Sequence, residues 1–166
     1  MIVPGQKLSV NFKMKVVRDG VTSEVGFAEL LTRRTIVSIH MRNNTPSCDR
    51  QVDALAGCAE AFGRAGYAVL AVSRDTCGSH ERYGAKKEIG GSVILVSDPD
   101  DLFAKAADAV VDKVLYGRRY RGPARSAFVL GADGTVLAVI EKVDTQRFAE
   151  QLRVAVAGLD AGSRGI

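Results

Sequence analysis

The sequence lacks the marks of several protein classes. None of its hydrophobic runs is long enough to cross a lipid bilayer, and residues 1–5 contain no hydrophobic stretch like the centre of a signal peptide. The three cysteines are an odd number, include no C-x-x-C pair and do not have the spacing of a zinc site. We therefore expect a protein of the reducing cytoplasm, with no membrane partner, whose thiols serve reactivity or packing.

A strong excess of charge of one sign is also absent. The net charge of the 166 residues is +4, with 25% charged and 46% hydrophobic residues, an ordinary balance for a globular protein. One basic run, Arg118-Arg119-Tyr120-Arg121, could suit an anionic partner, but a solvated loop beside a functional site is the better interpretation. We therefore expect no nucleic-acid partner. The length predicts one domain over 1–166, with its core from about 8 to 157 and a frayed tail over 158–166.

Hydrophobic periodicity predicts strands and helices that alternate along the chain. The predicted order is a hairpin over 8–25, a helical piece over 27–31, strands over 35–39, 67–73 and 92–96, helices over 48–64, 76–87 and 100–112, a hairpin over 127–140 and a closing helix over 144–157. Residues 117–123 are expected to form a Gly- and Arg-rich connection, and the buried face of the helix 100–112 is expected to carry Phe103, Val110, Val111 and Val114. This order predicts an α/β fold whose central mixed sheet is covered by helices on both faces.

The stretch Asn43-Asn44-Thr45-Pro46-Ser47-Cys48 joins a predicted buried strand to a predicted amphipathic helix. Ser47 has the chemistry of an N-cap, which would place the sulfur of Cys48 in the first helical turn. Unpaired backbone N–H groups and the helix dipole favour an anion there, so the thiol would ionise more readily and become a nucleophile. The local pattern alone fits equally well a small cysteine that is simply buried where a helix begins.

Three further segments carry motifs. They are Val72-Ser73-Arg74-Asp75 with Ser79-His80, then Leu95-Val96-Ser97-Asp98-Pro99-Asp100, then Tyr116-Gly117-Arg118-Arg119-Tyr120-Arg121-Gly122 with Arg125-Ser126-Ala127-Phe128. Together with Thr45-Pro46-Ser47-Cys48, in this order, they resemble the motifs of the peroxiredoxins, and most of all the peroxiredoxin Q (bacterioferritin-comigratory-protein) group of the AhpC/TSA superfamily. The resemblance implies a thioredoxin-like fold and a thiol peroxidase that reduces hydrogen peroxide or small alkyl hydroperoxides.

The resemblance also implies a role for each site residue. Cys48 would be the peroxidatic nucleophile that becomes a sulfenic acid. The hydroxyl of Thr45 would bridge the peroxide and the sulfur, although a plain turn hydroxyl remains an alternative. Arg125 would lower the thiol pKa and polarise the peroxide, with Gln51 orienting it. Backbone N–H groups of Ser47 and Cys48 would bind the peroxide as well.

One position departs from the family pattern. The family carries a proline four residues before Thr45, where it shields the cysteine, and this sequence carries Met41. Methionine can still cover a sulfur, but it is flexible and does not fix φ. We therefore expect peroxidase activity that is retained but reduced. The alternative is a redox sensor without turnover, or a binding protein, on the same scaffold with a pocket altered at Met41.

The other two cysteines are candidates for resolving the sulfenic acid. Cys58 shares the predicted apolar helix face with Leu55, so core packing is the better interpretation. Cys77 begins the next predicted helix, near the family's alternative resolving position, although that position itself falls on Gly84. Resolution by Cys77 and resolution by an external thiol both remain open.

The resemblance implies partners too. A peroxide is the substrate, thioredoxin or a similar dithiol recycles the protein, and no metal or organic cofactor takes part. We expect a monomer or a weak homodimer. His80 has charged neighbours and no second histidine at metal-ligand spacing, so we expect its side chain to be solvated.

Overall fold

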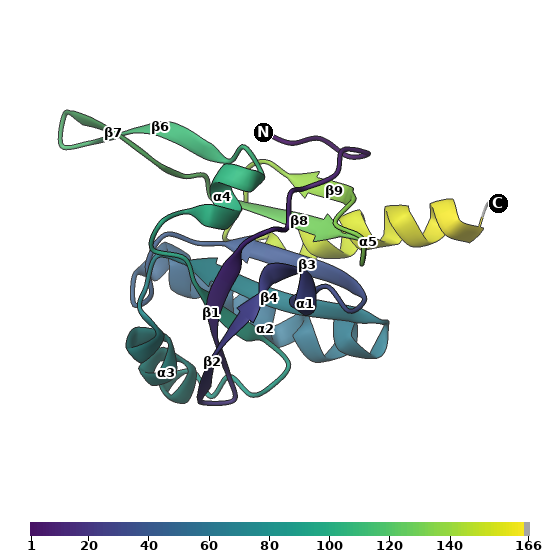
Figure 1. Cartoon of the computed structure of the whole chain (residues 1–166), viewed down its shortest axis with the longest axis horizontal. Coiled ribbons are helices and arrows are strands. Elements are labelled where there is room, and N and C mark those ends of the chain that lie inside the picture. Colours follow the sequence, from purple (N-terminus) through teal and green to yellow (C-terminus); the bar gives the residue numbers. More distant parts are fainter. Residues whose placement is uncertain (165–166) are drawn as a thin grey trace.

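The computed structural model describes residues 1–164 and has a seven-stranded sheet at its centre (Figure 1). The strands of this sheet, in the spatial order β2-β1-β5-β4-β3-β8-β9, are β1 (Lys13–Arg18), β2 (Val21–Gly26), β3 (Arg34–Ile39), β4 (Tyr67–Ser73), β5 (Ile94–Ser97), β8 (Ser126–Leu130) and β9 (Val136–Ile140). A separate hairpin consists of β6 (Val110–Leu115) and β7 (Arg118–Pro123). The helices are α1 (Phe27–Leu30), α2 (Pro46–Arg64), α3 (Cys77–Lys86), α4 (Leu102–Ala106) and α5 (Phe148–Arg164).

The middle of the sheet is parallel. Strand β4 pairs in parallel with β3 and β5, whereas β1 and β8 run antiparallel to their neighbours. Leu55 of α2 and Leu152 of α5 are buried on one face, and Phe27 of α1 and Phe103 of α4 are buried on the other. Because helices cover both faces, β3 and β4 are buried almost throughout. The prediction of a central mixed sheet flanked by helices, with an N-terminal hairpin, is confirmed.

The prediction for the segment after α4 is wrong. We expected one helix over 100–112 and an irregular connection over 117–123, but the helix is short and the chain continues as the strands β6 and β7. Asp108 adopts a positive φ of 50°, which interrupts a helix, and the β-branched residues after it favour a strand. Tyr116 and Gly117 have φ of 52° and 77°, and a two-residue type I′ hairpin turn needs positive φ at both positions.

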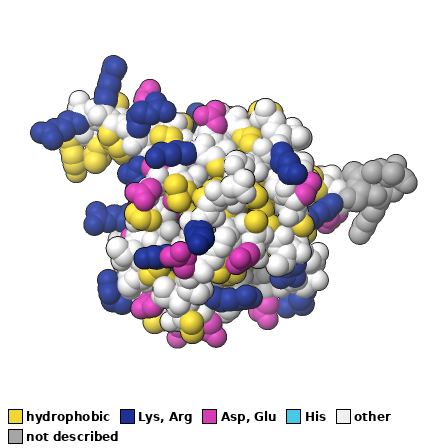
Figure 2. Space-filling view, viewed as in Figure 1, with side chains coloured by type: hydrophobic (Ala, Val, Ile, Leu, Met, Phe, Trp, Pro, Cys, Tyr) yellow, Lys and Arg dark blue, Asp and Glu magenta, His cyan; other side chains and the backbone are white. Residues whose placement is uncertain are grey.

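The hairpin β6–β7, which we call the arm, projects from the body of the molecule (Figure 1). Hydrophobic and basic side chains gather on it, at the upper left of Figure 2. At its outer end Val114 is 67% exposed, Leu115 56% and Tyr116 96%. We expected Val110, Val111 and Val114 in the core, but the first two are only half-buried and Val114 is exposed, because no helix covers the outer part of this strand pair.

The C-terminal helix is longer than predicted. Helix α5 begins at Phe148 rather than near residue 144, and it continues through 158–164, where we expected a frayed tail. Leu159 packs against the core residues that α2 and α5 cover, and this contact stabilises the C-terminal part of the helix. Residues 165–166 of the predicted tail lie outside the described residues. Within the described part of the chain, no helix combines the length and the hydrophobicity needed to span a bilayer.

Two glycines provide opposite tests of this fold. Gly134, in the turn between β8 and β9, has a φ of +87°, and a Cβ there would lie 3.2 Å from the carbonyl oxygen of Leu8. Gly57 lies in α2 with nothing within 4 Å of an added Cβ. We expect Gly134→Ala to lower the free energy of unfolding by about 1–2 kcal/mol, and Gly57→Ala to raise it by about 0.5–1 kcal/mol. Urea unfolding measures both, and a neutral Gly134→Ala would contradict the turn geometry.

Candidate active site

Cys48 lies where β3 leads into α2. The helix begins at Pro46, with Thr45 in the extended N-cap conformation and the first helical hydrogen bond from the Asp49 N–H to the Thr45 carbonyl. Ser47 is therefore inside the helix, and its prediction as the N-cap is wrong: Pro46 fits the first helical position because its missing N–H would be unpaired there anyway. Cys48 is in the first turn, as predicted, and its side chain is buried, with 1% of the residue exposed.

Arg125 reaches Cys48 from far along the chain. Strand β8 pairs antiparallel with β3, with Ser126 opposite Ile39, so the residue before β8 lies beside the end of β3. The Nη1 of Arg125 is 3.4 Å from the Sγ of Cys48 and also donates to the Oε1 of Gln51 at 2.9 Å. The structure thus brings together three of the predicted site residues.

Gln51 is held at both ends of its amide. Its nitrogen donates to the Oγ of Ser38 at 2.8 Å and to the carbonyl oxygen of Ile39 at 2.9 Å, while its oxygen accepts from Arg125. The residue is fully buried. Because both donor contacts are to β3, Gln51 ties the guanidinium of Arg125 to the strand that precedes Cys48.

The surroundings of Cys48 favour its thiolate. Burial alone would raise the pKa of the thiol, but hydrogen bonds from the Thr45 side chain and from the backbone N–H groups of Arg42 and Met41, together with the charge of Arg125, lower the pKa below its ordinary value. The Thr45 hydroxyl also lies 2.9 Å from the carbonyl oxygen of Arg42. Because it has one hydrogen, it donates to only one of these partners at a time, and an ionised sulfur is the stronger acceptor.

The surroundings of Cys58, unlike those of Cys48, favour the protonated thiol. It is buried in α2, its sulfur points at the carbonyl oxygens of Ala54 (3.1 Å) and Leu55 (3.4 Å), and burial raises its pKa. The prediction that Cys58 packs in the core is confirmed.

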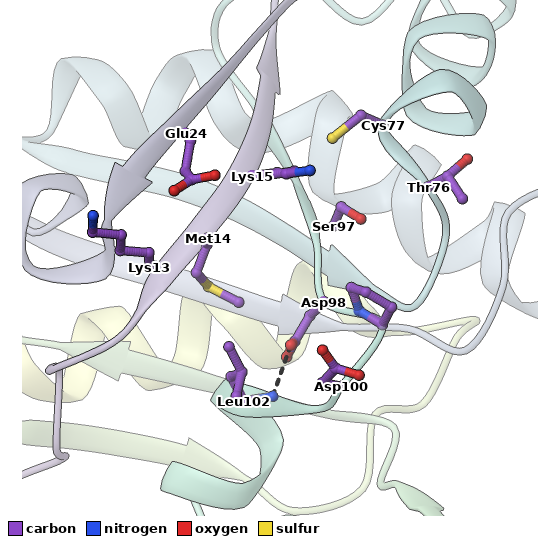
Figure 3. A pocket seen from close by; sticks show the side chains of 11 residues that line it. Lys13, Met14, Lys15, Glu24, Thr76, Cys77, Ser97, Asp98, Asp100 and Leu102 are labelled. Atoms are coloured by element: carbon purple, nitrogen blue, oxygen red, sulfur yellow. Dashed lines mark hydrogen bonds between the residues drawn. The ribbon is translucent and has the colours of Figure 1, made fainter.

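Cys77 is the first residue of α3 and is half-buried. Thr76 caps this helix, with its Oγ1 accepting from the N–H of Ser79 at 3.1 Å. Cys77 lines a hollow of about 470 Å³ between the N-terminal hairpin and the segment 97–102 (Figure 3). Lys15 and Ser97 border the same hollow, but Cys48 does not, so in this state the structure does not bring the two thiols together.

A buried polar network joins the loop before Cys48 to α3. Asn43 accepts from the Nε2 of His40 at 2.7 Å and donates to the Nδ1 of His80 at 3.0 Å, and the Nε2 of His80 donates to the carbonyl oxygen of Val96 at 3.0 Å. Asp75 accepts from the backbone N–H of Asn43 at 2.9 Å. Burial lowers the pKa of His40 to about 4 and also lowers the pKa of His80, so both rings are neutral.

Sequence reasoning missed this network. We expected a solvated His80, but it is fully buried. The available signal was that Asn43 and Asp75 each follow a strand of the predicted mixed sheet, because the carboxyl ends of neighbouring strands lie at one edge where those strands are parallel. His40 is hydrogen-bonded to Asn43 through its Nε2, and its Nδ1 has no hydrogen-bond partner in the described residues.

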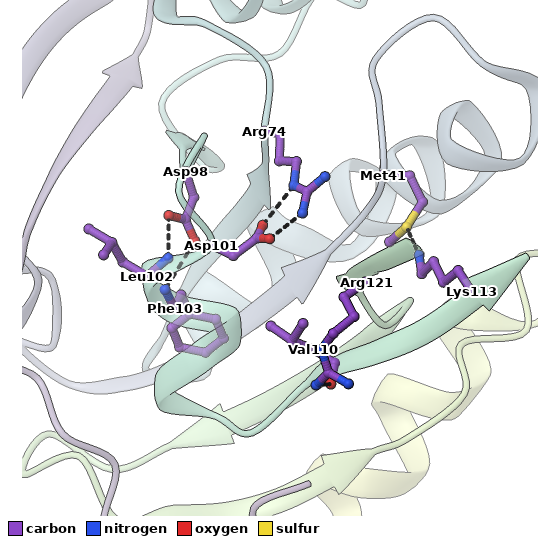
Figure 4. A network of polar contacts seen from close by, with 9 residues as sticks. All are labelled: Met41, Arg74, Asp98, Asp101, Leu102, Phe103, Val110, Lys113 and Arg121. Atoms are coloured by element: carbon purple, nitrogen blue, oxygen red, sulfur yellow. Dashed lines mark hydrogen bonds and ion pairs between the residues drawn. The ribbon is translucent and has the colours of Figure 1, made fainter. Parts of the chain in front are cut away.

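Met41 contacts the arm. It is half-buried, and its Sδ lies 2.6 Å from the Nζ of Lys113 on β6 (Figure 4). Nearby, Asp101 accepts two hydrogen bonds from the guanidinium of Arg74, one of them at 2.9 Å from Nε.

In the part of the chain that the structure describes, no three His, Cys, Asp or Glu side chains are grouped to hold a metal ion.

The amino-acid sequence is similar to those of known proteins. The sequence model of the AhpC/TSA family matches residues 4–139. The chain is 31% identical over 121 residues to the peroxiredoxin Bcp of Xanthomonas campestris, an alignment that covers 73% of this chain and 74% of the relative. It is 25% identical over 146 residues to a putative peroxiredoxin bcp of Helicobacter pylori J99, covering 88% of this chain and 93% of that protein.

Solved structures share the fold. The bacterioferritin comigratory protein of X. campestris, studied for alkyl peroxide reduction, has a TM-score of 0.81 at 23% identity, over 93% of this chain and 98% of its own. PrxQ of Xylella fastidiosa has a TM-score of 0.83 at 23% identity, over 98% of both chains. The predicted peroxiredoxin-type, thioredoxin-like fold is thereby confirmed. On the family match and these relatives, this chain belongs to the AhpC/TSA family and is similar to its peroxiredoxin Q (Bcp) members.

Proposed function

We propose that this protein is a thiol peroxidase that reduces hydrogen peroxide or small alkyl hydroperoxides through Cys48. The observation that carries the proposal is the buried Cys48 sulfur, 3.4 Å from the guanidinium of Arg125 and with a lowered pKa. A buried thiol without such a partner would hold its proton more tightly and would be inert. The relatives named peroxiredoxins support the same reaction class.

The first step is a two-electron displacement. The Cys48 thiolate attacks one peroxide oxygen, an S–O bond forms as the O–O bond breaks, and the departing oxygen leaves as water or an alcohol after taking up a proton. Negative charge moves from sulfur to the departing oxygen, so donors must face both. Arg125 supplies a charged donor, and Thr45 can turn its hydrogen from the Arg42 carbonyl towards the sulfur or the peroxide.

The backbone at the start of α2 supplies further donors. The first helical hydrogen bond comes from Asp49, so the N–H groups of Ser47 and Cys48 have no partner within the helix. We infer that these groups bind the peroxide oxygens, and that Met41 borders the space in which the peroxide lies.

The sulfenic acid must then be reduced by a thiol. We infer that Cys77 attacks the Cys48 sulfur, forming a disulfide and releasing water, and that thioredoxin or a similar dithiol reduces this disulfide. The two sulfurs are free in the structure, and we infer that the start of α2 unwinds locally so that they can meet. We propose that the protein works as a monomer or weak homodimer in the cytoplasm, where such thiols stay reduced.

Removal of the reacting groups tests the function. We expect Cys48→Ser to abolish peroxide reduction and Arg125→Met to lower the rate constant about a hundredfold or more, because a donor to the developing charge is lost. Arg64→Met, at the exposed end of α2, is the matched control and should leave the rate unchanged. Stopped-flow oxidation and coupled turnover measure these effects. Oxidation of the wild type in a single round, without turnover in excess reductant, would indicate the sensor instead.

The pH profile gives a second prediction. Because the pKa of Cys48 lies below its ordinary value, the oxidation rate should fall as the pH drops through that lowered pKa, at a lower pH than for an ordinary thiol. In Thr45→Val, which keeps the branched shape but removes the donor, the pKa should rise and the falling edge should move to higher pH. Ultraviolet titration of the thiolate in a Cys77→Ser background measures the pKa directly. An unchanged pKa would contradict the role of Thr45.

The resolving thiol can be identified by mass. After one equivalent of peroxide, we expect non-reducing peptide mapping to find a Cys48–Cys77 disulfide in the wild type and in Cys58→Ser. Cys77→Ser should accumulate the sulfenic acid and lose turnover with thioredoxin. Full turnover of Cys77→Ser would show that an external thiol resolves the intermediate.

A further inference from the structure

Lys113 brings a second cation to the Cys48 site. It lies on β6, is half-buried, and directs its amino group at the sulfur of Met41 (Figure 4). A thioether is an uncharged, weak acceptor, so this contact does not balance the ammonium charge. Among the described residues, no carboxylate oxygen lies within 4.0 Å of the charged nitrogens of Lys113 or Arg125.

The charges around Lys113 are mostly positive. Burial lowers its pKa, and the positive charges of Arg125 and Arg74 lower it further, whereas Cys48 and Asp101 act in the opposite direction. Asp101 is already held by the guanidinium of Arg74. The negative group left to balance Lys113 and Arg125 is therefore the Cys48 thiolate, which can balance only one of them.

The arm is hollowed beside this cation. Lys113 borders a hollow of about 440 Å³ in the arm, together with Arg119 and Tyr120. Asp112 also lines this hollow, but its carboxylate is paired with Arg121 at 2.9 Å. An anionic group could thus approach the ammonium without displacing a protein carboxylate.

The geometry points to Lys113 as a binding residue for a negatively charged group on the substrate, so that the protein prefers hydroperoxides that carry a carboxylate near the O–O bond. The carboxylate binds the ammonium while the O–O bond lies beside the Cys48 sulfur, within reach of the Arg125 guanidinium. An anionic substrate is repelled by the thiolate, and the second cation offsets this repulsion. Hydrogen peroxide has no such group and makes no use of Lys113. This inference rests on the proposed peroxidase function.

A matched pair of substrates tests the inference. One is a tertiary alkyl hydroperoxide with a terminal carboxylate, and the other is its methyl ester, which has nearly the same shape without the charge. Stopped-flow measurement gives the rate constant of Cys48 oxidation by each. The wild type should favour the carboxylate. Lys113→Met, which keeps the apolar stem, should lose this preference by about five- to tenfold, as expected when a partly exposed charge-assisted hydrogen bond is removed.

Lys105→Met is the control, because it removes the same charge from an exposed position on α4 and should keep the preference. Added salt should weaken the preference in the wild type and not in Lys113→Met. The same carboxylate-to-ester ratio in both proteins, or a ratio near one in the wild type that also oxidises normally with hydrogen peroxide, would overturn this inference alone. Failure of every peroxide, hydrogen peroxide included, to oxidise Cys48 would overturn the proposed function as well.

Discussion

The contact between Arg125 and Cys48 is the interaction on which the site depends. The two residues are 77 positions apart and meet because β8 pairs with β3 in one register. A slip of this register by one residue would turn each side chain of β8 to the other face of the sheet. Without the guanidinium and the surrounding donors, burial of the sulfur would raise its pKa and quench its reactivity. Gln51 forms hydrogen bonds both to Arg125 and to β3, so the fold holds the guanidinium in place before a substrate binds.

The same region must also be able to move. Hydrogen bonds between Asn43 and the side chains of His40, His80 and Asp75 hold the loop before Cys48 against the start of α3. Buried polar groups are costly to leave unpaired, so these bonds keep the loop in one conformation while the thiol is reduced. Cys77 begins the helix on the far side of this network. In the proposed resolution by Cys77, a disulfide would join the starts of α2 and α3, and we expect the network to open as it forms.

The arm contacts the position where this sequence departs from the family pattern. Lys113 of the arm lies against Met41. In our proposal, Met41 borders the space for the peroxide and the ammonium of Lys113 adds a positive charge beside it. Substrate choice would then depend on residues from two distant segments, the loop after β3 and the strand β6.

The sequence by itself determined the strand-to-helix step at Cys48, the hairpin over 127–140 and the alternation of strands and helices, because each follows from local periodicity and turn chemistry. The ordered motifs, through their resemblance to a family, also indicated Arg125. Only the tertiary structure decided that the arm is a strand pair, that His80 is buried and that Lys113 faces Met41. The periodicity of a short apolar run such as Val110-Val111 does not distinguish a helix from a strand, and burial of a polar side chain depends on partners that come from other segments. Strand register and long-range packing make those choices, and local sequence does not contain them.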